Sequence, residues 1–468
     1  MKQEIKRIIL VLVGLCLAFI SLIVYISFFQ VFKATTVKNN SYNKRLWINE
    51  ESILRGSFLD RNGKTLVYSE KKDSSYERHY LYGRLYSHII GYSYREYGKA
   101  GLELQYNNQL LNISENAAIN ELKNLVSPTT EGNNIKITID HELQTKARNL
   151  LKGKKGSIIA MNPVNGEVYA MVSLPDFDVN RIKEDWKTIT ERPDSPLINR
   201  ATQGLYEPGS VFKVITTAAF LEDEDMDITY DCTGTANVGG YEFTDYNKKA
   251  HGSLDLKRAL AESCNTYFTT KSVEVGKDLI GNTADKFMLN NKIPFDLPVK
   301  NSQFPYKGLL DKTELAAAAI GQGKVLVTPL NMAMVASGIA NGGQVVKPIL
   351  VKEVLSKDGK VLKTNTTEIL SLATDPINAN LIKEMMVEAV NSGTGTRARI
   401  KNVKVAGKTG TAETSSGKSH AWFIGFAPAD EPKVAVAVVL EEENSTGGTA
   451  AAPMARDIML HVINNINE

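Results

Sequence analysis

The chain has 468 residues, of which 43% are hydrophobic and 23% are charged, and this length favours two to three domains over one. Such a composition excludes a disordered chain, a collagen-like chain and a polytopic membrane protein. The 55 basic and 52 acidic side chains leave a net charge of +3, which indicates no nucleic-acid-binding surface. An odd count of three cysteines, Cys16, Cys232 and Cys264, excludes a disulfide framework.

The first element predicted along the chain is a membrane-spanning helix over residues 8–29, an apolar stretch without a charge. At about 1.5 Å per residue, such a helix crosses the roughly 30 Å hydrocarbon core of a bilayer. Lys6 and Arg7 precede it, and the positive-inside rule then puts residues 1–7 in the cytoplasm. A cleaved signal peptide is the alternative, but no small-x-small cleavage site follows Phe29. We therefore expect a single-pass anchor in the cell membrane with an extracytoplasmic body.

Two domains are predicted after this anchor. Residues 30–134 are polar and rich in tyrosine, with short strand-like pieces and turns at Asn62-Gly63 and Gly91-Tyr92. We predict a small pedestal domain here. From residue 135 the pattern changes to mixed helices and strands and continues so to the end, which predicts one large α+β domain over residues 135–468.

The large domain is predicted to contain two strand hairpins and several apolar helices. Residues 135–140 alternate as a strand does, and residues 141–153 form an amphipathic helix that ends at Gly153. Residues 156–175 read as two strands joined at Asn165-Gly166, a strong hairpin signal. The later predictions are helices over residues 208–222, 315–323 and 380–390, and a second hairpin over residues 421–442.

Several enzyme classes are excluded because their motifs are incomplete. Residues 407–409 (Gly-Lys-Thr) resemble the end of a phosphate-binding loop, but Asn402 stands where its first glycine belongs. His141 begins a zinc-protease pattern, but Thr145 replaces the second histidine. No G-x-S-x-G elbow occurs, and the six histidines are scattered. We therefore predict no metal site, no cofactor and no Ser-His-Asp triad.

A serine hydroxyl without histidine can still be activated by a lysine that its surroundings keep deprotonated. An S-x-x-K pattern on a helix places the amine beside the hydroxyl. The pattern occurs four times, but only Ser210, with Lys213, opens an apolar helix. An ordinary N-cap is the alternative role for Ser210. The other three serines, in polar stretches rich in turns, are Ser41, Ser69 and Ser415.

Two further motifs accompany this serine and favour a catalytic role. Residues 263–265 (Ser-Cys-Asn) follow a predicted helix, and residues 408–411 (Lys-Thr-Gly-Thr) precede the second hairpin. S-x-N also occurs at Ser41 and Ser114, whereas K-T-G occurs once. The three motifs in this order are typical of penicillin-interacting serine acyl transferases.

With these motifs the chain resembles the class B penicillin-binding proteins, the monofunctional peptidoglycan D,D-transpeptidases. The resemblance covers nearly the whole length. It implies a serine β-lactamase-like α+β domain, with an antiparallel sheet flanked by helices, behind the pedestal and one transmembrane helix. The other segments that carry it are Arg55-Gly56, residues 60–63 (Asp-Arg-Asn-Gly), Gly98, residues 101–103 (Gly-Leu-Glu), 206–210 (Tyr-Glu-Pro-Gly-Ser), 320–323 (Ile-Gly-Gln-Gly), 327–330 (Val-Thr-Pro-Leu) and 422–425 (Trp-Phe-Ile-Gly).

The resemblance implies four catalytic residues. Ser210 attacks the penultimate carbonyl of a D-Ala-D-Ala stem peptide, expels the terminal D-alanine and forms an acyl-enzyme, which an amine from a neighbouring stem converts into a cross-link. Lys213 is the expected general base. Lys408 supplies positive potential and attracts the substrate carboxylate. Ser263 relays a proton to the leaving amine.

The expected substrate-binding residues follow from the same resemblance. Asn265 holds the substrate amide, and Thr409, Gly410 and Thr411 line the site of the terminal carboxylate, with the threonine hydroxyls as donors. The backbone N–H groups of residues 210 and 411 are the expected oxyanion hole. Cys264 replaces the aspartate of related β-lactamases, and its side chain is expected to point away from the chemistry. Whether this thiol forms a disulfide with the one at position 232 stays open.

The same fold supports other functions. A D,D-carboxypeptidase differs only in the acyl acceptor, and the pedestal and anchor argue against it. A serine β-lactamase normally uses an additional glutamate, and Glu314 has the surroundings of a transpeptidase helix instead. A β-lactam sensor needs more membrane helices or an output domain. The expected partners are peptidoglycan stem peptides, β-lactams as covalent inhibitors and a SEDS-family glycan polymerase in the membrane, and no nucleic acid.

Overall fold

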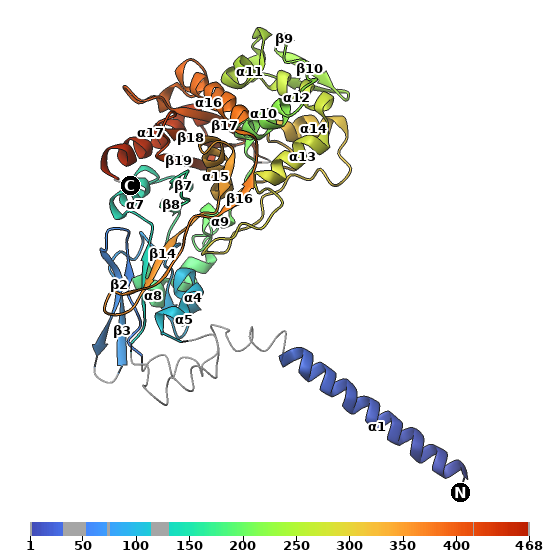
Figure 1. Cartoon of the computed structure of the whole chain (residues 1–468), viewed down its shortest axis with the longest axis vertical. Coiled ribbons are helices and arrows are strands. Elements are labelled where there is room, and N and C mark those ends of the chain that lie inside the picture. Colours follow the sequence, from blue (N-terminus) through green and yellow to red (C-terminus); the bar gives the residue numbers. More distant parts are fainter. Residues whose placement is uncertain (1, 31–52, 73–74, 114–130, 415, 467–468) are drawn as a thin grey trace.

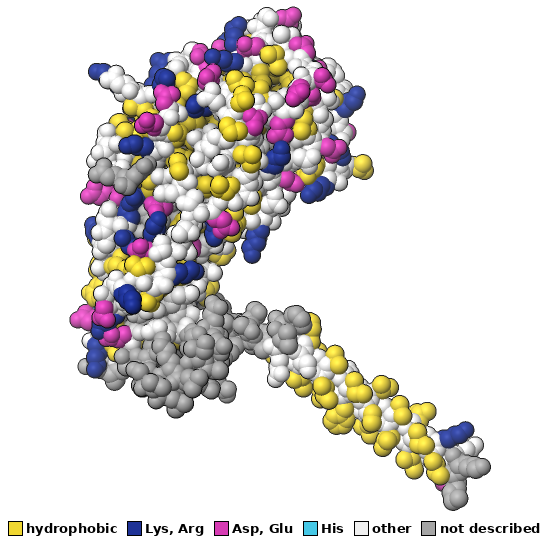
Figure 2. Space-filling model, in the orientation of Figure 1, with side chains coloured by type: hydrophobic (Ala, Val, Ile, Leu, Met, Phe, Trp, Pro, Cys, Tyr) yellow, Lys and Arg dark blue, Asp and Glu magenta, His cyan; other side chains and the backbone are white. Residues whose placement is uncertain are grey.

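The computed structural model describes residues 2–30, 53–72, 75–113, 131–414 and 416–466 (Figure 1). Helix α1 (Lys2–Phe28) contains nearly all of the predicted apolar segment, and it is the one helix of the described chain that is long and apolar enough to cross a membrane. Its apolar side chains are exposed, and Figure 2 shows them along most of the length of the helix. Exposed apolar side chains along a whole helix are what a lipid environment requires.

A five-stranded antiparallel sheet with the order β17-β18-β19-β7-β8 forms the centre of the large domain. Both predicted hairpins are confirmed: β7 pairs with β8 across Asn165-Gly166, and β18 pairs with β19. Gly166 has a φ of 80°, which suits glycine in such a turn. The strands are β7 (Gly156–Met161), β8 (Val168–Leu174), β17 (Ala406–Glu413), β18 (Ser419–Ala427) and β19 (Val434–Glu443).

Helices cover both faces of this sheet. Helices α7 (His141–Leu150) and α17 (Gly447–Asn465) pack on one face, and α15 (Pro329–Ala340) packs on the other. Consecutive residues of β18 therefore belong to different cores: Phe423 packs with α17, and Trp422 packs on the other side. Burial of both faces explains why the sequence of β19 is a continuous apolar run without alternation. The predicted α+β domain with a helix-flanked antiparallel sheet is confirmed.

A helical lobe stands beside the sheet, at the end of the molecule away from the pedestal (Figure 1). Short two-stranded ribbons lie on this lobe. One of them pairs β9 (Tyr230–Cys232) with β12 (Gly252–Leu254). The other ribbon pairs β10 (Thr235–Val238) with β11 (Tyr241–Thr244). The helices of the lobe are α10 (Lys213–Leu221), α11 (Leu256–Glu262), α12 (Asn265–Val275), α13 (Lys277–Lys286), α14 (Lys312–Ala319) and α16 (Pro376–Asn391).

The pedestal is built on a six-stranded sheet with the order β15-β14-β6-β1-β2-β3. Strand β6 contains the predicted domain boundary at residues 134 and 135, and β14 and β15 come from far beyond it in the sequence. The sheet thus joins the two predicted domains, while the boundary itself stays a prediction. The strands are β1 (Phe58–Leu59), β2 (Thr65–Lys72), β3 (Ser75–Tyr80), β6 (Asn134–Ile137), β14 (Val351–Leu355) and β15 (Val361–Thr364).

Shorter elements complete the described chain. Near the pedestal they are β4 (Ser93–Tyr94), β5 (Gly98–Lys99), α4 (Gly101–Gln105), α5 (Asn107–Leu110), η2 (Val179–Arg181), α8 (Ile182–Glu191) and α9 (Arg200–Gln203). In the large domain they are η3 (Gly209–Phe212), η4 (Tyr246–Lys248), β13 (Gln344–Val346), β16 (Ile369–Leu372) and η5 (Thr396–Ala398).

A buried ion network explains two of the pedestal segments that carry the family resemblance. Glu103 on α4 is fully buried, and its carboxylate accepts hydrogen bonds from Arg55 Nε at 2.6 Å and Arg78 Nε at 2.8 Å. Burial favours the neutral acid, but the two guanidinium groups outweigh it and hold the pKa of Glu103 below its usual range. Gly101 opens the helix at a φ of 58°, where a Cβ atom would lie 2.6 Å from the carbonyl oxygen of Ile89.

We expect the Glu103→Gln variant to lose about 3 kcal/mol of unfolding free energy, because the neutral amide leaves the buried Arg55 and the partly buried Arg78 without a counter-charge. Thermal denaturation of the purified chain measures the loss as a lower midpoint. The Glu77→Gln variant is the matched control, since Glu77 pairs with Lys72 at the exposed surface, where such pairs contribute little. Equal midpoints for the two variants would contradict a structural role of the network.

Candidate active site

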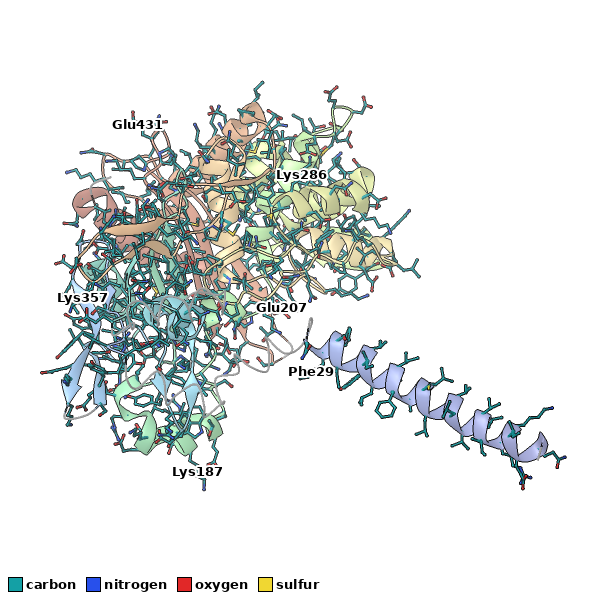
Figure 3. All side chains as sticks on the ribbon, turned by 60° about the horizontal axis from the view of Figure 1, so that its bottom comes forward. Phe29, Lys187, Glu207, Lys286, Lys357 and Glu431 are labelled. Atoms are coloured by element: carbon teal, nitrogen blue, oxygen red, sulfur yellow. The ribbon has the colours of Figure 1, made fainter. Side chains whose placement is uncertain are left out.

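The predicted nucleophile lies on a short loop that is pressed against the edge strand of the sheet. Ser210 lies in η3 (Gly209–Phe212), directly before α10, and is partly exposed. Gly209 has a φ of 56° and donates its N–H to the carbonyl of Gly321 at 2.9 Å. A Cβ atom at Gly209 would lie 2.9 Å from the carbonyl oxygen of Thr411 on β17. Glycine is therefore required where the loop approaches this strand. Figure 3 marks the same loop at Glu207.

Lys213 is the first residue of α10 and is completely buried. Its Nζ donates to the carbonyl of Ser263 and to Oδ1 of Asn265, both at 2.7 Å. Burial lowers the pKa of Lys213 to about 8, although the nearby Cys264 and Asp245 raise it. A neutral amine has two N–H bonds and one lone pair. The two observed bonds use both N–H groups, which leaves the lone pair to accept a proton.

Lys408, on β17, is the second completely buried amine of the site. Its Nζ donates to Ser263 Oγ at 2.8 Å and to the carbonyl of Thr409 at 3.1 Å. Burial, reinforced by the charge of Lys213, lowers the pKa of Lys408 well below its usual range. Ser263 Oγ also lies 3.5 Å from Lys213 Nζ. One hydroxyl thus touches both amines, and repulsion between them favours a single shared proton.

The S-x-N motif is held in place by a residue that the sequence did not point to. Ser263 has a left-handed backbone, with a φ of 62°, between α11 and α12. Asp245 is buried, and its Oδ1 accepts hydrogen bonds from the backbone N–H groups of Asn265 and Thr266. The side chain of Asn265 donates to the carbonyl of Thr244 at 2.9 Å. No pattern could have indicated Asp245, because an isolated aspartate in a polar turn has no signature.

The three residues of the predicted carboxylate site lie on β17, at the edge of the sheet. Thr411 is exposed, and its hydroxyl accepts from the N–H of Gly447 at 3.3 Å. Thr409 is 6% exposed, and its hydroxyl lies 2.6 Å from that of Thr394, which the sequence did not indicate. At Gly410, a Cβ atom would lie 2.8 Å from the carbonyl oxygen of Pro208, so only glycine lets the nucleophile loop close on the strand.

The structure therefore brings Ser210, Lys213, Ser263, Asn265 and Lys408 to one place, between the sheet edge and the helical lobe. Of the other S-x-x-K serines, Ser69 lies on β2 in the pedestal, and Ser41 and Ser415 lie outside the described residues. The cluster can attack a carbonyl with a hydroxyl, take up a proton on a buried amine and pass it on through a second hydroxyl.

Within the described chain, one group of side chains beside this cluster has donors suited to a metal ion. Cys232, Asp245, His251 and Cys264 place one donor atom each within 4.8 Å of one another. Cys232 Sγ lies 3.2 Å from Asp245 Oδ2 and 3.3 Å from His251 Nδ1. Tetrahedral zinc, with Zn–S near 2.3 Å and Zn–N near 2.0 Å, separates its ligand atoms by about 3.5 Å. The donor types are those that zinc uses, while the prediction of no metal site stays a prediction.

Comparisons with known proteins agree with this geometry. Residues 156–460 match the penicillin-binding protein transpeptidase domain, and residues 55–135 match the penicillin-binding protein A dimerisation domain. The peptidoglycan D,D-transpeptidase PbpA of Mycolicibacterium smegmatis is 32% identical over 91% of this chain and 92% of its own length. The namesake from Mycobacterium tuberculosis is 31% identical over 92% of this chain and 93% of its own length.

Solved structures of similar proteins also superimpose on this chain. The imipenem acyl-enzyme complex of penicillin-binding protein A from M. tuberculosis superimposes with a TM-score of 0.82 at 30% identity, covering 89% of this chain and 99% of the other. A D,D-transpeptidase domain from Eggerthella lenta superimposes with a TM-score of 0.80 at 32% identity, covering 89% of this chain and 100% of the other. The predicted resemblance is confirmed, and the chain belongs to the penicillin-binding protein transpeptidase family.

Proposed function

We propose that the chain is a peptidoglycan D,D-transpeptidase that cross-links stem peptides through an acyl-enzyme on Ser210. The observation that carries this proposal is the pair of buried amines, on Lys213 and Lys408, joined by the hydroxyl of Ser263 beside the nucleophile loop. Support comes from the relatives, which are named D,D-transpeptidases, and from the similar structure that holds an imipenem acyl-enzyme.

Acylation begins when the hydroxyl of Ser210 attacks the carbonyl carbon of the penultimate D-alanine. The lone pair of Lys213 accepts the hydroxyl proton as the new C–O bond forms. The negative charge on the carbonyl oxygen is stabilised by the backbone N–H groups of Ser210 and Thr411, each contributing about 3 kcal/mol. The proton then passes through Ser263 to the leaving nitrogen, the C–N bond breaks, and D-alanine departs.

The remaining contacts orient the substrate. The exposed hydroxyl of Thr411 binds the terminal carboxylate, whose charge is attracted by the one proton that the two lysine amines share. Asn265 uses one amide hydrogen on Thr244, and its second amide hydrogen is left for the substrate backbone. The buried hydroxyl of Thr409 acts through Thr394, to which it is hydrogen bonded. A β-lactam acylates Ser210 by the same step. Its leaving nitrogen remains covalently attached to the acyl group and does not depart, so the acyl-enzyme persists.

A paired-peptide assay tests this function and separates it from a carboxypeptidase. The purified chain is given a donor peptide ending in D-Ala-D-Ala and an acceptor stem with a free side-chain amine, and products are identified by mass spectrometry. We expect a cross-linked dimer and free D-alanine, with neither formed by the Ser210→Ala variant. Shortened donor without dimer would establish a D,D-carboxypeptidase instead.

We further propose that α1 is a membrane anchor with its N-terminus in the cytoplasm, because Lys6 and Arg7 directly precede its apolar part. Protease added to intact spheroplasts should digest the body and spare a tag fused before residue 1. Digestion of the tag and protection of the body would reverse the orientation.

A SEDS-family glycan polymerase is the proposed membrane partner, reached through α1 and the pedestal. Scrambling residues 8–29 at constant composition keeps the hydropathy of the anchor but changes its surface. We therefore expect the scrambled chain to stay in the membrane and to lose co-purification with the polymerase. Unchanged polymerase activity in cells without this protein would contradict the partnership.

A further inference from the structure

A cavity of about 270 Å³ lies where residues 87–105 of the pedestal meet residues 177–298 of the large domain. Helices α4 and α9, both labelled in Figure 1, contribute to its lining. Its volume is near the lower end of the range for sites that bind small molecules, about 300–1000 Å³. None of the described active-site residues lines it, so the cavity is separate from the active site and the mechanism above does not use it.

Much of the cavity wall is apolar. Phe177 and Leu297 are buried, at 4% and 5% exposure, and Tyr92 lies against Phe177 with ring centroids 6.3 Å apart. Leu104 and Leu197, each 37% exposed, also line the cavity, which is therefore open to solvent on their side. A wall of this kind favours the binding of a hydrocarbon group.

One polar group of the lining is buried without a partner. Thr202 on α9 is 1% exposed, and its Oγ1 makes no hydrogen bond to any described residue. The backbone of Thr202 is fixed, because its N–H donates to the carbonyl of Asn199 at 3.2 Å and its carbonyl accepts the N–H of Lys300 at 2.9 Å. A buried hydroxyl without a partner is unfavourable, and a ligand that accepts its hydrogen removes this penalty.

The charge of the lining favours an anion. Lys99, which is 8% exposed, is the one charged side chain among the described residues that line the cavity, and none of these residues has a carboxylate. His88 also lines it, and burial lowers the pKa of this imidazole to about 4. Its Nε2 lies 2.7 Å from the carbonyl oxygen of Pro196 and donates to it. The imidazole is therefore neutral near pH 7.

We propose that this cavity binds a small monocarboxylate whose acid group is attached to a short apolar chain. The carboxylate pairs with Lys99 and accepts the hydrogen of the Thr202 hydroxyl, while the apolar chain packs on Phe177 and Leu297. One negative charge matches the one cation of the lining. Two classes of molecule have this chemistry: free short-chain fatty acids, and peptides whose last residue is small and apolar. The site does not depend on the proposed function.

The test follows the thermal unfolding midpoint of the full chain in detergent. The probes are hexanoate, N-acetyl-D-alanine and the neutral amide of each. We expect at least one carboxylate to raise the midpoint by about 2 °C at ten times its dissociation constant, and its amide to bind at least about tenfold more weakly. A response to hexanoate alone identifies a fatty acid as the ligand, and a response to N-acetyl-D-alanine alone identifies a peptide end. No shift with either carboxylate at about 10 mM, or equal binding of acid and amide, would overturn the proposal.

The Thr202→Val variant keeps the shape of the side chain and removes its hydroxyl. Without ligand it should unfold at a slightly higher temperature, because no unpaired hydroxyl is then buried, and it should bind the carboxylate about tenfold more weakly. Thr374→Val is the matched control, since Thr374 is 3% exposed, its hydroxyl also has no described partner, and it does not line the cavity. We expect this control to bind as the wild type does. Unchanged binding by Thr202→Val would place the probe in another site and overturn the assignment.

A second pair of variants tests the role of the cation. Lys99→Met removes the charge from the lining, whereas Lys300→Met removes it from an exposed neighbour that does not line the cavity. We expect Lys99→Met to bind the acid and its amide equally well, and Lys300→Met to keep the preference for the acid. A preference that survives in Lys99→Met would contradict the assigned ion pair. The comparison of acid and amide on the wild type needs no variant, so a variant that fails to fold leaves the test intact.

Discussion

The Ser210→Ala variant is expected to lose covalent labelling by a fluorescent penicillin, with a rate at least about 1000-fold below that of the wild type. The hydroxyl of Ser210 forms the ester bond of the acyl-enzyme, and alanine leaves the two lysines without a nucleophile to activate. In-gel fluorescence measures the rate, and intact mass gives one adduct per chain. A stable wild-type adduct fits a transpeptidase, whereas an adduct that clears within seconds indicates a β-lactamase.

The Ser69→Ala variant is the matched control for this experiment, because it makes the same change in another S-x-x-K sequence. Ser69 lies on β2 and accepts a hydrogen bond from Arg78, and the lysine of its pattern, Lys72, is exposed and paired with Glu77. An exposed, paired ammonium cannot serve as a base at neutral pH. We expect wild-type labelling from Ser69→Ala. Labelling that persists in Ser210→Ala would place the nucleophile elsewhere.

The catalytic motifs could be predicted from the sequence because each is local. The proline and glycine before Ser210 set the loop, and a spacing of three residues on one helix brings Lys213 near it. The strand hairpins could be predicted equally well, because β18 and β19 are long apolar runs separated by a turn. The sequence shows no contact between the three motifs. Their assignment to one site depended on their order along the chain and on the resemblance to a known family.

Contacts between distant segments could not be predicted in the same way. Asp245 supports the S-x-N motif across the lobe, and Thr394 meets Thr409 from the end of α16. Neither residue stands at a periodic position or in a repeated pattern. The position of β14 in the pedestal sheet could not be predicted for the same reason, because its pairing with β6 joins parts of the chain that are far apart in the sequence. Such pairings are decided by the packing of the whole molecule.

Loss of the buried amine at position 213 is expected to slow acylation about 1000-fold. In the Lys213→Met variant a side chain of similar length fills the same space but cannot accept the proton of Ser210. Lys271→Met is the matched control, because Lys271 is also buried, at 5% exposure, but pairs with Glu274 on the same helix. We expect nearly normal labelling from that control. Equal losses in the two variants would indicate that burial of any lysine, and not catalysis, explains the effect.

The pH dependence of acylation distinguishes a single base from a shared proton. The active form has a free amine, so the wild-type rate should rise about tenfold per pH unit below the pKa of Lys213, about 8, and level off above it. The hydroxyl of Ser263 lies between this amine and that of Lys408, and repulsion between two buried ammonium groups disfavours charge on both.

Removal of Lys408 should leave the pKa of Lys213 nearly unchanged. Burial and the charge of Lys213 hold the pKa of Lys408 well below its usual range, so Lys408 is already neutral at the pH where Lys213 titrates, near 8. In a Lys408→Met variant, the rising part of the pH profile should therefore keep its midpoint while the maximal rate falls. A midpoint that moves to higher pH would show that Lys408 still carries charge when Lys213 titrates. An unchanged midpoint would show that the two amines, joined through one serine hydroxyl, hold a single proton below this pH and that Lys213 is the one that releases it.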